Sequence, residues 1–277
     1  MSDKVKKVIL WFVAVFLTLG LVVYQRATGP TYPIKGKADV AGEEISFRFL
    51  RSHDTGTDAP VAVEVSDPQV EGLLEFRRYK SHDEWSRVEM QRSGENLESA
   101  IPHQPPAGKV MYNVILVKDG KEYKLNEEPV IIRFKGSVPY AVLAPHIFFM
   151  FLSLLFGIRA GLEALTIRKD TRYLSGISLI TVVLGGLILG PVVQKYAFDA
   201  YWTGWPFGHD LTDNKTAVIF IFWLVAWLKL KKDPGHRTMA IVAMVVMIIV
   251  YIIPHSVLGS EIDYTQTSKE KTEIQQK

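Results

Sequence analysis

The chain of 277 residues contains no cysteine. This absence excludes thiolate nucleophiles, cysteine-ligated zinc, iron–sulfur clusters and covalently attached c-type haem. The common phosphate-binding, dinucleotide-binding, zinc-protease and serine-hydrolase motifs are also missing from the sequence. The sequence therefore favours a non-enzymatic role.

The chain also has little net charge. The chain has 32 Lys and Arg against 29 Asp and Glu, a net charge of +3. In the polar part, residues 26–137, no basic patch is interleaved with aromatic residues, so we expect no binding of nucleic acid. Hydrophobic residues make up 48% of the chain and are concentrated in five runs.

Each apolar run predicts a helix that crosses the lipid bilayer, which needs about 20 residues. The first run follows three lysines and lacks a small-x-small cleavage site, so we expect an uncleaved signal anchor rather than a cleaved signal peptide. The fourth run is the shortest. The five runs cover residues 8–24, about 140–158, 174–193, 217–228 and 238–257.

Basic residues cluster at the N-terminus, between the second and third runs, and between the fourth and fifth runs. With five crossings, all three clusters fall on one side of the membrane. Because short cytoplasmic loops are rich in Lys and Arg, we expect a bacterial-type inner (plasma) membrane protein with a cytoplasmic N-terminus. The polar residues between the first and second runs are then extracytoplasmic, and so is the C-terminus.

Residues 35–135 read as a β domain. Apolar residues alternate in four segments, and turns recur every 8–12 residues or so, as in an antiparallel sandwich. Asp119–Gly120 predicts a tight hairpin turn, and the proline-rich stretch 101–108 predicts a loop. We expect seven or eight strands in an immunoglobulin-like or fibronectin-like sandwich. The alternating residues are Ile45, Phe47, Phe49; Val61, Val63, Val65; Val110, Tyr112, Val114, Leu116; and Val130, Ile132, Phe134.

These patterns predict a mixed membrane protein with an all-β domain inserted among five transmembrane α-helices. Residues 1–29 form the signal-anchor helix, and residues 30–137 form the extracytoplasmic sandwich. Residues 138–259 form a four-helix bundle with an aromatic-rich outer loop at 190–216. The polar tail, 260–277, is expected to be disordered past Tyr264.

Three histidines are predicted to lie on the extracytoplasmic side of this bundle. His146 and His255 each follow a proline near the end of an apolar run, and His209 lies in the aromatic-rich loop. Two imidazoles from different helices can bind haem b, which makes His146 and His255 candidate cofactor ligands. A divalent metal is the other possibility, because imidazole and carboxylate suit zinc, manganese or iron. The candidate metal ligands are His146, His209, His255, Asp199, Asp210 and Glu261.

Structural roles explain the same residues without a ligand. His146 can bond a carbonyl freed by the proline, while the other two histidines can lie among lipid headgroups. Thr212 or Asp213 is expected to cap the fourth helix. For Arg159 and Glu163, four residues apart, we expect a pair on a helix surface or side chains that snorkel to the membrane interface.

Two functions remain open at the level of sequence. The first is a membrane protein whose sandwich serves as an interaction, assembly or sensing module for a protein partner on the extracytoplasmic side. The alternative is a haem- or metal-binding redox protein with its site at the outer end of the bundle. In both cases the lipid bilayer surrounds the helices.

Overall fold

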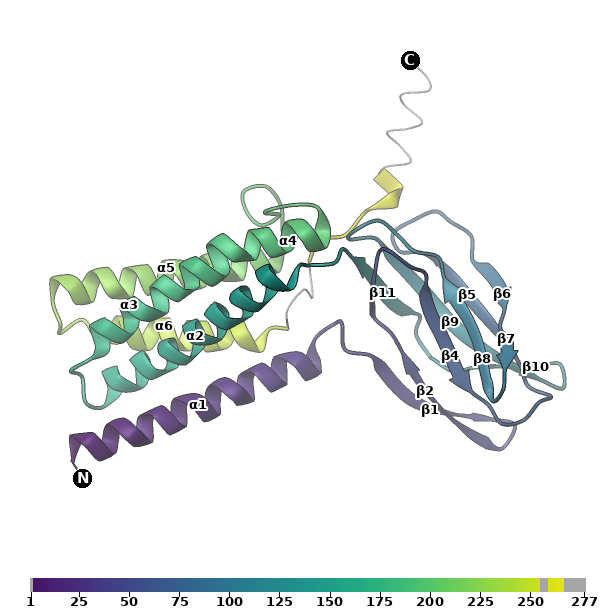
Figure 1. Cartoon of the computed structure of the whole chain (residues 1–277), viewed down its shortest axis with the longest axis horizontal. Coiled ribbons are helices and arrows are strands. Elements are labelled where there is room, and N and C mark those ends of the chain that lie inside the picture. Colours follow the sequence, from purple (N-terminus) through teal and green to yellow (C-terminus); the bar gives the residue numbers. More distant parts are fainter. Residues whose placement is uncertain (1, 255–258, 267–277) are drawn as a thin grey trace, which may run out of the picture. The chain divides into compact units, whose positions relative to one another are not determined.

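The structure is a computed structural model that describes residues 2–254 and 259–266 (Figure 1). The chain divides into two compact units. The helical unit comprises residues 1–30 and 138–260, and the β unit comprises residues 31–137 and 261–277.

The β unit contains three sheets, and all strand pairs are antiparallel except β3 with β11. The first sheet pairs β1 (Ile34–Val40) with β2 (Glu43–Phe49). The second has the order β3 (Ser52–Asp54), β11 (Val130–Lys135), β9 (Lys109–Lys118), β5 (Glu71–Arg78) and β6 (Ser86–Glu89), with β10 (Lys121–Lys124) beside β9. The third has the order β4 (Ala59–Glu64), β8 (Asn96–Ile101) and β7 (Gln91–Ser93).

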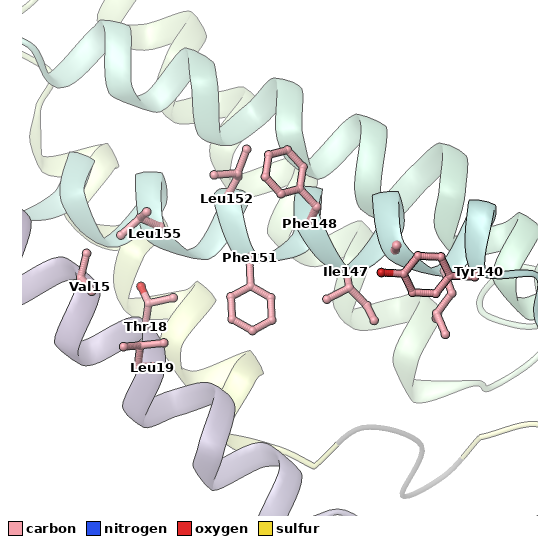
Figure 2. Close-up of a pocket in the computed structure, with 11 residues that line it drawn as sticks. Val15, Thr18, Leu19, Tyr140, Ile147, Phe148, Phe151, Leu152 and Leu155 are labelled. Atoms are coloured by element: carbon pink, nitrogen blue, oxygen red, sulfur yellow. The ribbon is translucent and has the colours of Figure 1, made fainter.

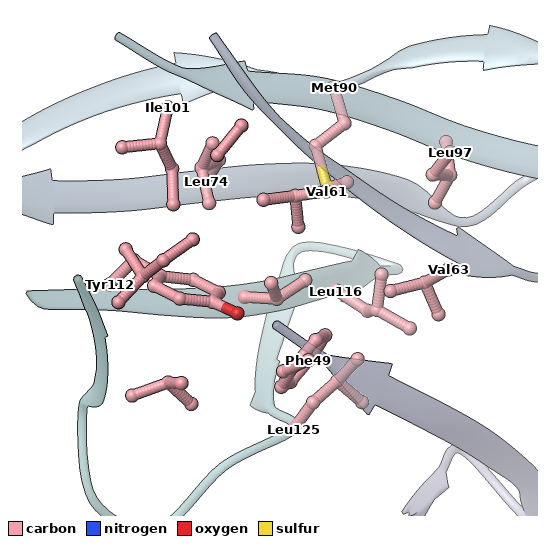
Figure 3. Close-up of a cluster of buried hydrophobic side chains, with 14 of the residues drawn as sticks. Phe49, Val61, Val63, Leu74, Met90, Leu97, Ile101, Tyr112, Leu116 and Leu125 are labelled. Carbon is pink, nitrogen blue, oxygen red and sulfur yellow. The ribbon is translucent and has the colours of Figure 1, made fainter. Parts of the chain in front are cut away.

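One hydrophobic core joins the three sheets (Figure 3). The alternation predicted from the sequence is confirmed in β4, where every second residue is buried. Tyr112 on β9 is 1% exposed, and its hydroxyl donates a hydrogen bond to the carbonyl of Leu50 at 2.8 Å. A large apolar side chain buried in this way contributes about 1.5–3 kcal/mol.

The turns of the β unit agree closely with the sequence signals. Lys118 pairs with Lys121, so Asp119 and Gly120 form a two-residue hairpin turn, as predicted. Both turn residues have positive φ, 52° and 73°, the geometry that such turns require. The described residues form eleven strands, more than the seven or eight expected, because several strands span only three or four residues.

In the part of the helical unit that the structure describes, four helices are long and apolar enough to cross a membrane, and one shorter helix is apolar. Within the third of the four, a π-helical segment (η1) replaces the regular α-helix. The helices are α1 (Asp3–Thr28), α2 (Tyr140–Leu165), the continuous helix α3 (Thr171–Val182), η1 (Val183–Leu189) and α4 (Gly190–Phe198), then α5 (Leu211–Lys232) and the shorter α6 (Thr238–Ile252).

The expectation that the fourth span is the shortest was wrong. Helix α5 has 22 residues, because it begins at Leu211 rather than at residue 217. Helix α6 has only 15 residues. Its C-cap, Ile253, is extended and precedes Pro254, a position where helical backbone is disfavoured.

Two glycines on α2 let α6 approach closely. A Cβ at Gly157 would lie 2.6 Å from the sulfur of Met247, and a Cβ at Gly161 would lie 2.3 Å from the sulfur of Met244. Close packing at small residues is a main source of helix association in lipid. Gly157 and Gly161 on α2 therefore face Met247 and Met244 on α6.

The positions of the basic clusters are fixed by contacts within the helical unit. Asp3 pairs with Lys169 at 2.8 Å and Lys7 pairs with Asp170, which joins the N-terminus to the α2–α3 connection. Gly176 near the start of α3 adjoins Trp227 near the end of α5. All three clusters thus lie at one end of the unit, called here the Leu165 end; the opposite end is the Tyr140 end.

The hairpin at Asp119–Gly120 provides a test of the β unit. Gly120→Ala should lower the free energy of unfolding by about 1 kcal/mol, because an L-residue is strained at positive φ. Gly56→Ala is the matched control, since Gly56 has open space around its Cβ position. Thermal unfolding followed by circular dichroism should show a loss for Gly120→Ala only; equal shifts would contradict the turn assignment.

Candidate functional site

The aromatic-rich loop at the Tyr140 end connects α4 to α5. Helix α4 ends at Phe198, and Asp199 at its C-cap adopts a left-handed conformation. Side chains of the loop that are large and apolar point into solvent or lipid. Trp205 is 77% exposed and Phe207 is 82% exposed. Aromatic residues of this kind are typical of a membrane–water interface.

Two buried carboxylates hold this loop in place. Asp213 accepts hydrogen bonds from the backbone N–H groups of Thr203 and Gly204, at 2.6 and 2.9 Å. Asp210 accepts bonds from the backbone N–H groups of Thr212 and Ser260, both at 2.8 Å. Backbone donors thus satisfy both carboxylates, which gives them a structural role.

The cap of α5 is Asp210, and the prediction of Thr212 or Asp213 at this position was wrong. Asp213 lies in the first turn of the helix and bonds back to the loop instead. Lys215, also buried, donates to the carbonyls of Ile253 and Pro254 at 2.8 and 3.1 Å. These carbonyls come directly after the end of α6, so the amino group satisfies acceptors that the short helix leaves free.

His146 contacts the π-helical segment. Its Nδ1 lies 2.8 Å from the carbonyl oxygen of Gly185, and this carbonyl can only accept, so Nδ1 carries the proton. In the neutral ring, Nε2 is then an acceptor. A histidine that donates Nδ1–H to a backbone carbonyl and presents Nε2 is the arrangement commonly found in metal-ligating histidines.

Among the described residues, the other predicted ligands have surroundings of their own. His209 is exposed, Asp199 pairs with Lys195 at 2.7 Å, and Glu261 pairs with two lysines of the β unit. His255 lies outside the described residues. Across residues 2–254 and 259–266, no group of three or more histidines and carboxylates is placed to hold a metal ion.

Arg159 and Glu163 were expected on a helix surface, and the structure places them in the interior instead. Their side chains are 2% and 0% exposed and form an ion pair of 2.9 Å. The guanidinium also lies 5.4 Å from the ring of Trp11 on α1. The second carboxylate oxygen of Glu163 accepts the backbone N–H of Asp170. Sequence spacing alone revealed the pair but not its burial, which depends on the packing of α1.

An apolar groove of about 550 Å³ lies between α1 and α2 (Figure 2). Its lining is almost entirely hydrocarbon, so it suits an apolar chain and offers no set of groups for catalysis. The lining residues are Val15, Thr18 and Leu19 on α1, and Tyr140, Leu143, Ala144, Ile147, Phe148, Phe151, Leu152 and Leu155 on α2.

The β unit binds the segment Glu261–Gln266 of its own chain. The Glu261 carboxylate forms ion pairs with both Lys80 and Lys109. The backbone N–H of Ile262 donates to the carbonyl of Ala107 at 3.3 Å. These contacts fix the start of the segment on the β unit, where the sequence predicted only a polar tail.

An aromatic residue fixes the segment further along. The guanidinium of Arg78 lies 4.4 Å from the ring centre of Tyr264, and the Tyr264 hydroxyl donates to Gln104 Oε1 at 3.2 Å. The backbone N–H of Thr265 donates to the carbonyl of Lys80 at 3.2 Å. The signal in the sequence is the alternation Glu-Ile-Asp-Tyr, which is typical of extended chain. The expectation of disorder past Tyr264 concerns mainly residues 267–277, which lie outside the described residues.

The charges at this surface stabilise the ionised form of Glu261. Burial by itself would raise its pKa, but hydrogen bonds from Lys109 and Lys80 outweigh burial and hold the pKa below its ordinary value of 4.5. The same contact raises the pKa of Lys80. For Lys109, burial lowers the pKa although Glu261 opposes this change. The two ammonium groups thus form a binding site for a carboxylate.

Comparison with protein-family models and with curated proteins finds no match for this chain. Function is therefore inferred from the side chains and their contacts. Of the features described, the surface that holds Glu261 and Tyr264 is the one where the β unit contacts a distant polar segment of its own chain.

The buried ion pair provides a stability test. Glu163→Gln should lower the stability of the helical unit by about 3 kcal/mol, because the Arg159 guanidinium is left buried without a counter-charge. The double variant Arg159→Met, Glu163→Leu should lose much less. Thermal unfolding in detergent, followed by tryptophan fluorescence, measures both.

The control for this test is the exposed pair Lys195–Asp199, which has the same four-residue spacing. Lys195→Gln should change stability by no more than about 0.5 kcal/mol. If Glu163→Gln and Lys195→Gln behaved alike, the buried pair would have no special role in stability.

Proposed function

We propose that this chain is a membrane-anchored interaction module that binds short peptide segments on the extracytoplasmic side. The β unit, in this proposal an immunoglobulin-like or fibronectin-like sandwich, is the binding part, and the helices hold it at the membrane. Binding would serve assembly or sensing. The single observation that carries the proposal is the binding of Glu261 and Tyr264 by the β unit.

The contacts define the chemistry of the bound segment. Lys80 and Lys109 select a carboxylate, and Arg78 selects an aromatic ring three residues later. Backbone bonds to Ala107 and Lys80 require an extended or turning chain between these two side chains. A protein partner that carries an acidic residue and an aromatic residue at this spacing would compete with the chain's own segment.

The proposed orientation rests on charge. Three basic clusters share the Leu165 end of the helical unit, which we assign to the cytoplasm of a bacterial-type inner (plasma) membrane. Both ends of the β unit's main segment connect to helices at the Tyr140 end: α1 ends at Thr28, and α2 begins at Tyr140. The β unit is then extracytoplasmic.

A peptide-binding assay tests the proposal. The receptor is the chain truncated after Ser260, and the probe is a labelled peptide with the sequence of residues 259–266. The truncated chain should bind the peptide, while the full chain should bind it more weakly, because a tethered segment competes at high effective concentration. Equal binding by both chains, or no binding by a truncated chain that still unfolds cooperatively, would refute the proposal.

Variants of the peptide separate the contributions. Glu261→Gln should weaken binding by at least about tenfold, since it removes two charge-assisted contacts. Tyr264→Ala should weaken it strongly, whereas the matched Tyr264→Phe, which loses only the hydroxyl bond to Gln104, should weaken it a few-fold.

Binding should also depend on pH. The bound Glu261 has a lowered pKa, so binding is complete above its ordinary value of 4.5 and is lost as pH falls through the lowered value. Fluorescence anisotropy between pH 3 and 7, on the order of one measurement per half unit, should show this loss. The Glu261→Gln peptide should lack it; if both peptides lost binding in parallel, another group would be responsible.

A second candidate function is a haem- or metal-binding membrane redox protein with His146 as a ligand. It is favoured by one observation, the Nδ1–H bond from His146 to Gly185, which leaves Nε2 as an acceptor. The further ligand in this proposal is His255 for haem b, or His209 and His255 for a divalent metal.

This second function predicts a Soret absorption band or stoichiometric metal in the detergent-purified chain. Either should be lost in His146→Ala, while His53→Ala, which changes a histidine of the β unit, should retain it. A colourless and metal-free preparation would exclude this function and leave the peptide-binding proposal untouched.

A further inference from the structure

Among the described residues, strand β6 forms an open edge of the largest sheet. It is the end strand in the order β3-β11-β9-β5-β6, and all four of its residues are exposed. The chain continues through Met90 into β7, which is an end strand of the third sheet. Met90 itself is buried and anchors the middle of this segment. Residues 86–93 therefore form one edge that belongs to two sheets.

The register shows which backbone groups face outward. The N–H of Met90 donates to the carbonyl of Gly72 at 2.8 Å. In an antiparallel pair, hydrogen-bonded positions alternate, so Val88 is the next residue that bonds to β5, opposite Leu74. The N–H and C=O groups of Arg87 and Glu89 therefore point away from the sheet, at its free edge.

The side chains at this edge are complementary to themselves. Two copies of β6 can pair antiparallel about a two-fold axis through Val88. Arg87 then lies opposite Glu89 of the second copy, and Glu89 lies opposite Arg87. Opposite charges directly across such a pair are stabilising, and like charges are destabilising. A pairing shifted by two residues would place Arg87 opposite Arg87, so the charges select this register.

The apolar residue at the centre agrees with the same pairing. Val88 is 44% exposed although it lies opposite Leu74, which is fully buried. At the two-fold axis the two Val88 side chains would meet and lose water contact. The guanidinium of Arg87 bonds to Glu75 and Glu122 of its own chain, and its side chain remains 51% exposed. Its remaining donors can reach Glu89 of the second copy.

We propose that two copies of this chain associate through β6, with their largest sheets joined edge to edge. Charged residues often protect a sheet edge against pairing. Here the two charges have opposite signs and stand two residues apart, which favours antiparallel pairing with an identical strand. A two-fold interface of this kind is the commonest form of self-association. The proposal is independent of the peptide site, which uses Lys80, Lys109 and Arg78.

Disulfide trapping in native membranes tests the pairing, and the absence of cysteine from the chain gives a clean background. The two Val88 positions form a non-hydrogen-bonded pair, whose Cα atoms lie about 4.5 Å apart, within disulfide range. Val88→Cys in the full chain should give a disulfide-linked homodimer. Glu98→Cys, at an exposed position on β8, is the control for random collision and should remain monomeric.

Charge variants make the test specific for the register. Adding Glu89→Lys to Val88→Cys should lower the dimer yield about tenfold, because two attractive pairs become repulsive. Adding Arg87→Glu as well should restore the yield, since the pairs become attractive again. Cooperative thermal unfolding shows that the variants are folded.

Three outcomes would overturn the proposal: no homodimer from Val88→Cys, an equal yield from Glu98→Cys, or a failure of the double charge reversal to restore the dimer. A crosslinked product with a different protein in place of the homodimer would overturn it too, and would assign the edge to another partner. A variant that loses peptide binding but still forms the dimer would show that the two proposals are independent. A variant that loses the dimer but still binds the peptide would show the same.

Discussion

The cost of burying charged and polar groups among apolar helices is the constraint on which the helical unit depends. Arg159 and Glu163 neutralise each other inside the unit, and Trp11 from α1 covers the guanidinium. A buried charge without such a partner is strongly destabilising. The first helix is therefore part of the folded unit and not only a membrane anchor. The ion pairs of Asp3 and Lys7 hold its N-terminus in the position that this cover needs.

The same constraint shapes the opposite end. The loop between α4 and α5 has few apolar contacts to hold it, and backbone groups at helix ends need partners. Asp210 and Asp213 supply acceptors for the loop, and Lys215 supplies a donor for the end of α6. Asp210, one of the candidate metal ligands in the sequence, is thus used to close the end of the bundle.

The sequence predicted those features that depend on local patterns. Alternating residues such as Tyr112 and Phe134 identified the strands, and Asp119–Gly120 identified a hairpin. The sequence did not predict features that depend on packing between distant segments. The burial of Arg159 requires Trp11, and the position of Glu261 requires Lys80 and Lys109. Local periodicity carries no information about such partners. The start of α5 was also misplaced, at residue 217 instead of Leu211, and its cap was assigned to the wrong residue.

In a regular helix, one added residue changes the direction in which all later residues point. The π-helical segment Val183–Leu189 removes this link between length and direction. A wider turn absorbs an extra residue without rotating the helix beyond it. A homologous chain one residue shorter in this segment would form a regular α-helix and still direct Gln194 toward Thr203. The carbonyl that accepts the Nδ1–H of His146 belongs to Gly185, inside this segment. A change of length here would therefore alter the contact of His146 and leave that of Gln194 in place.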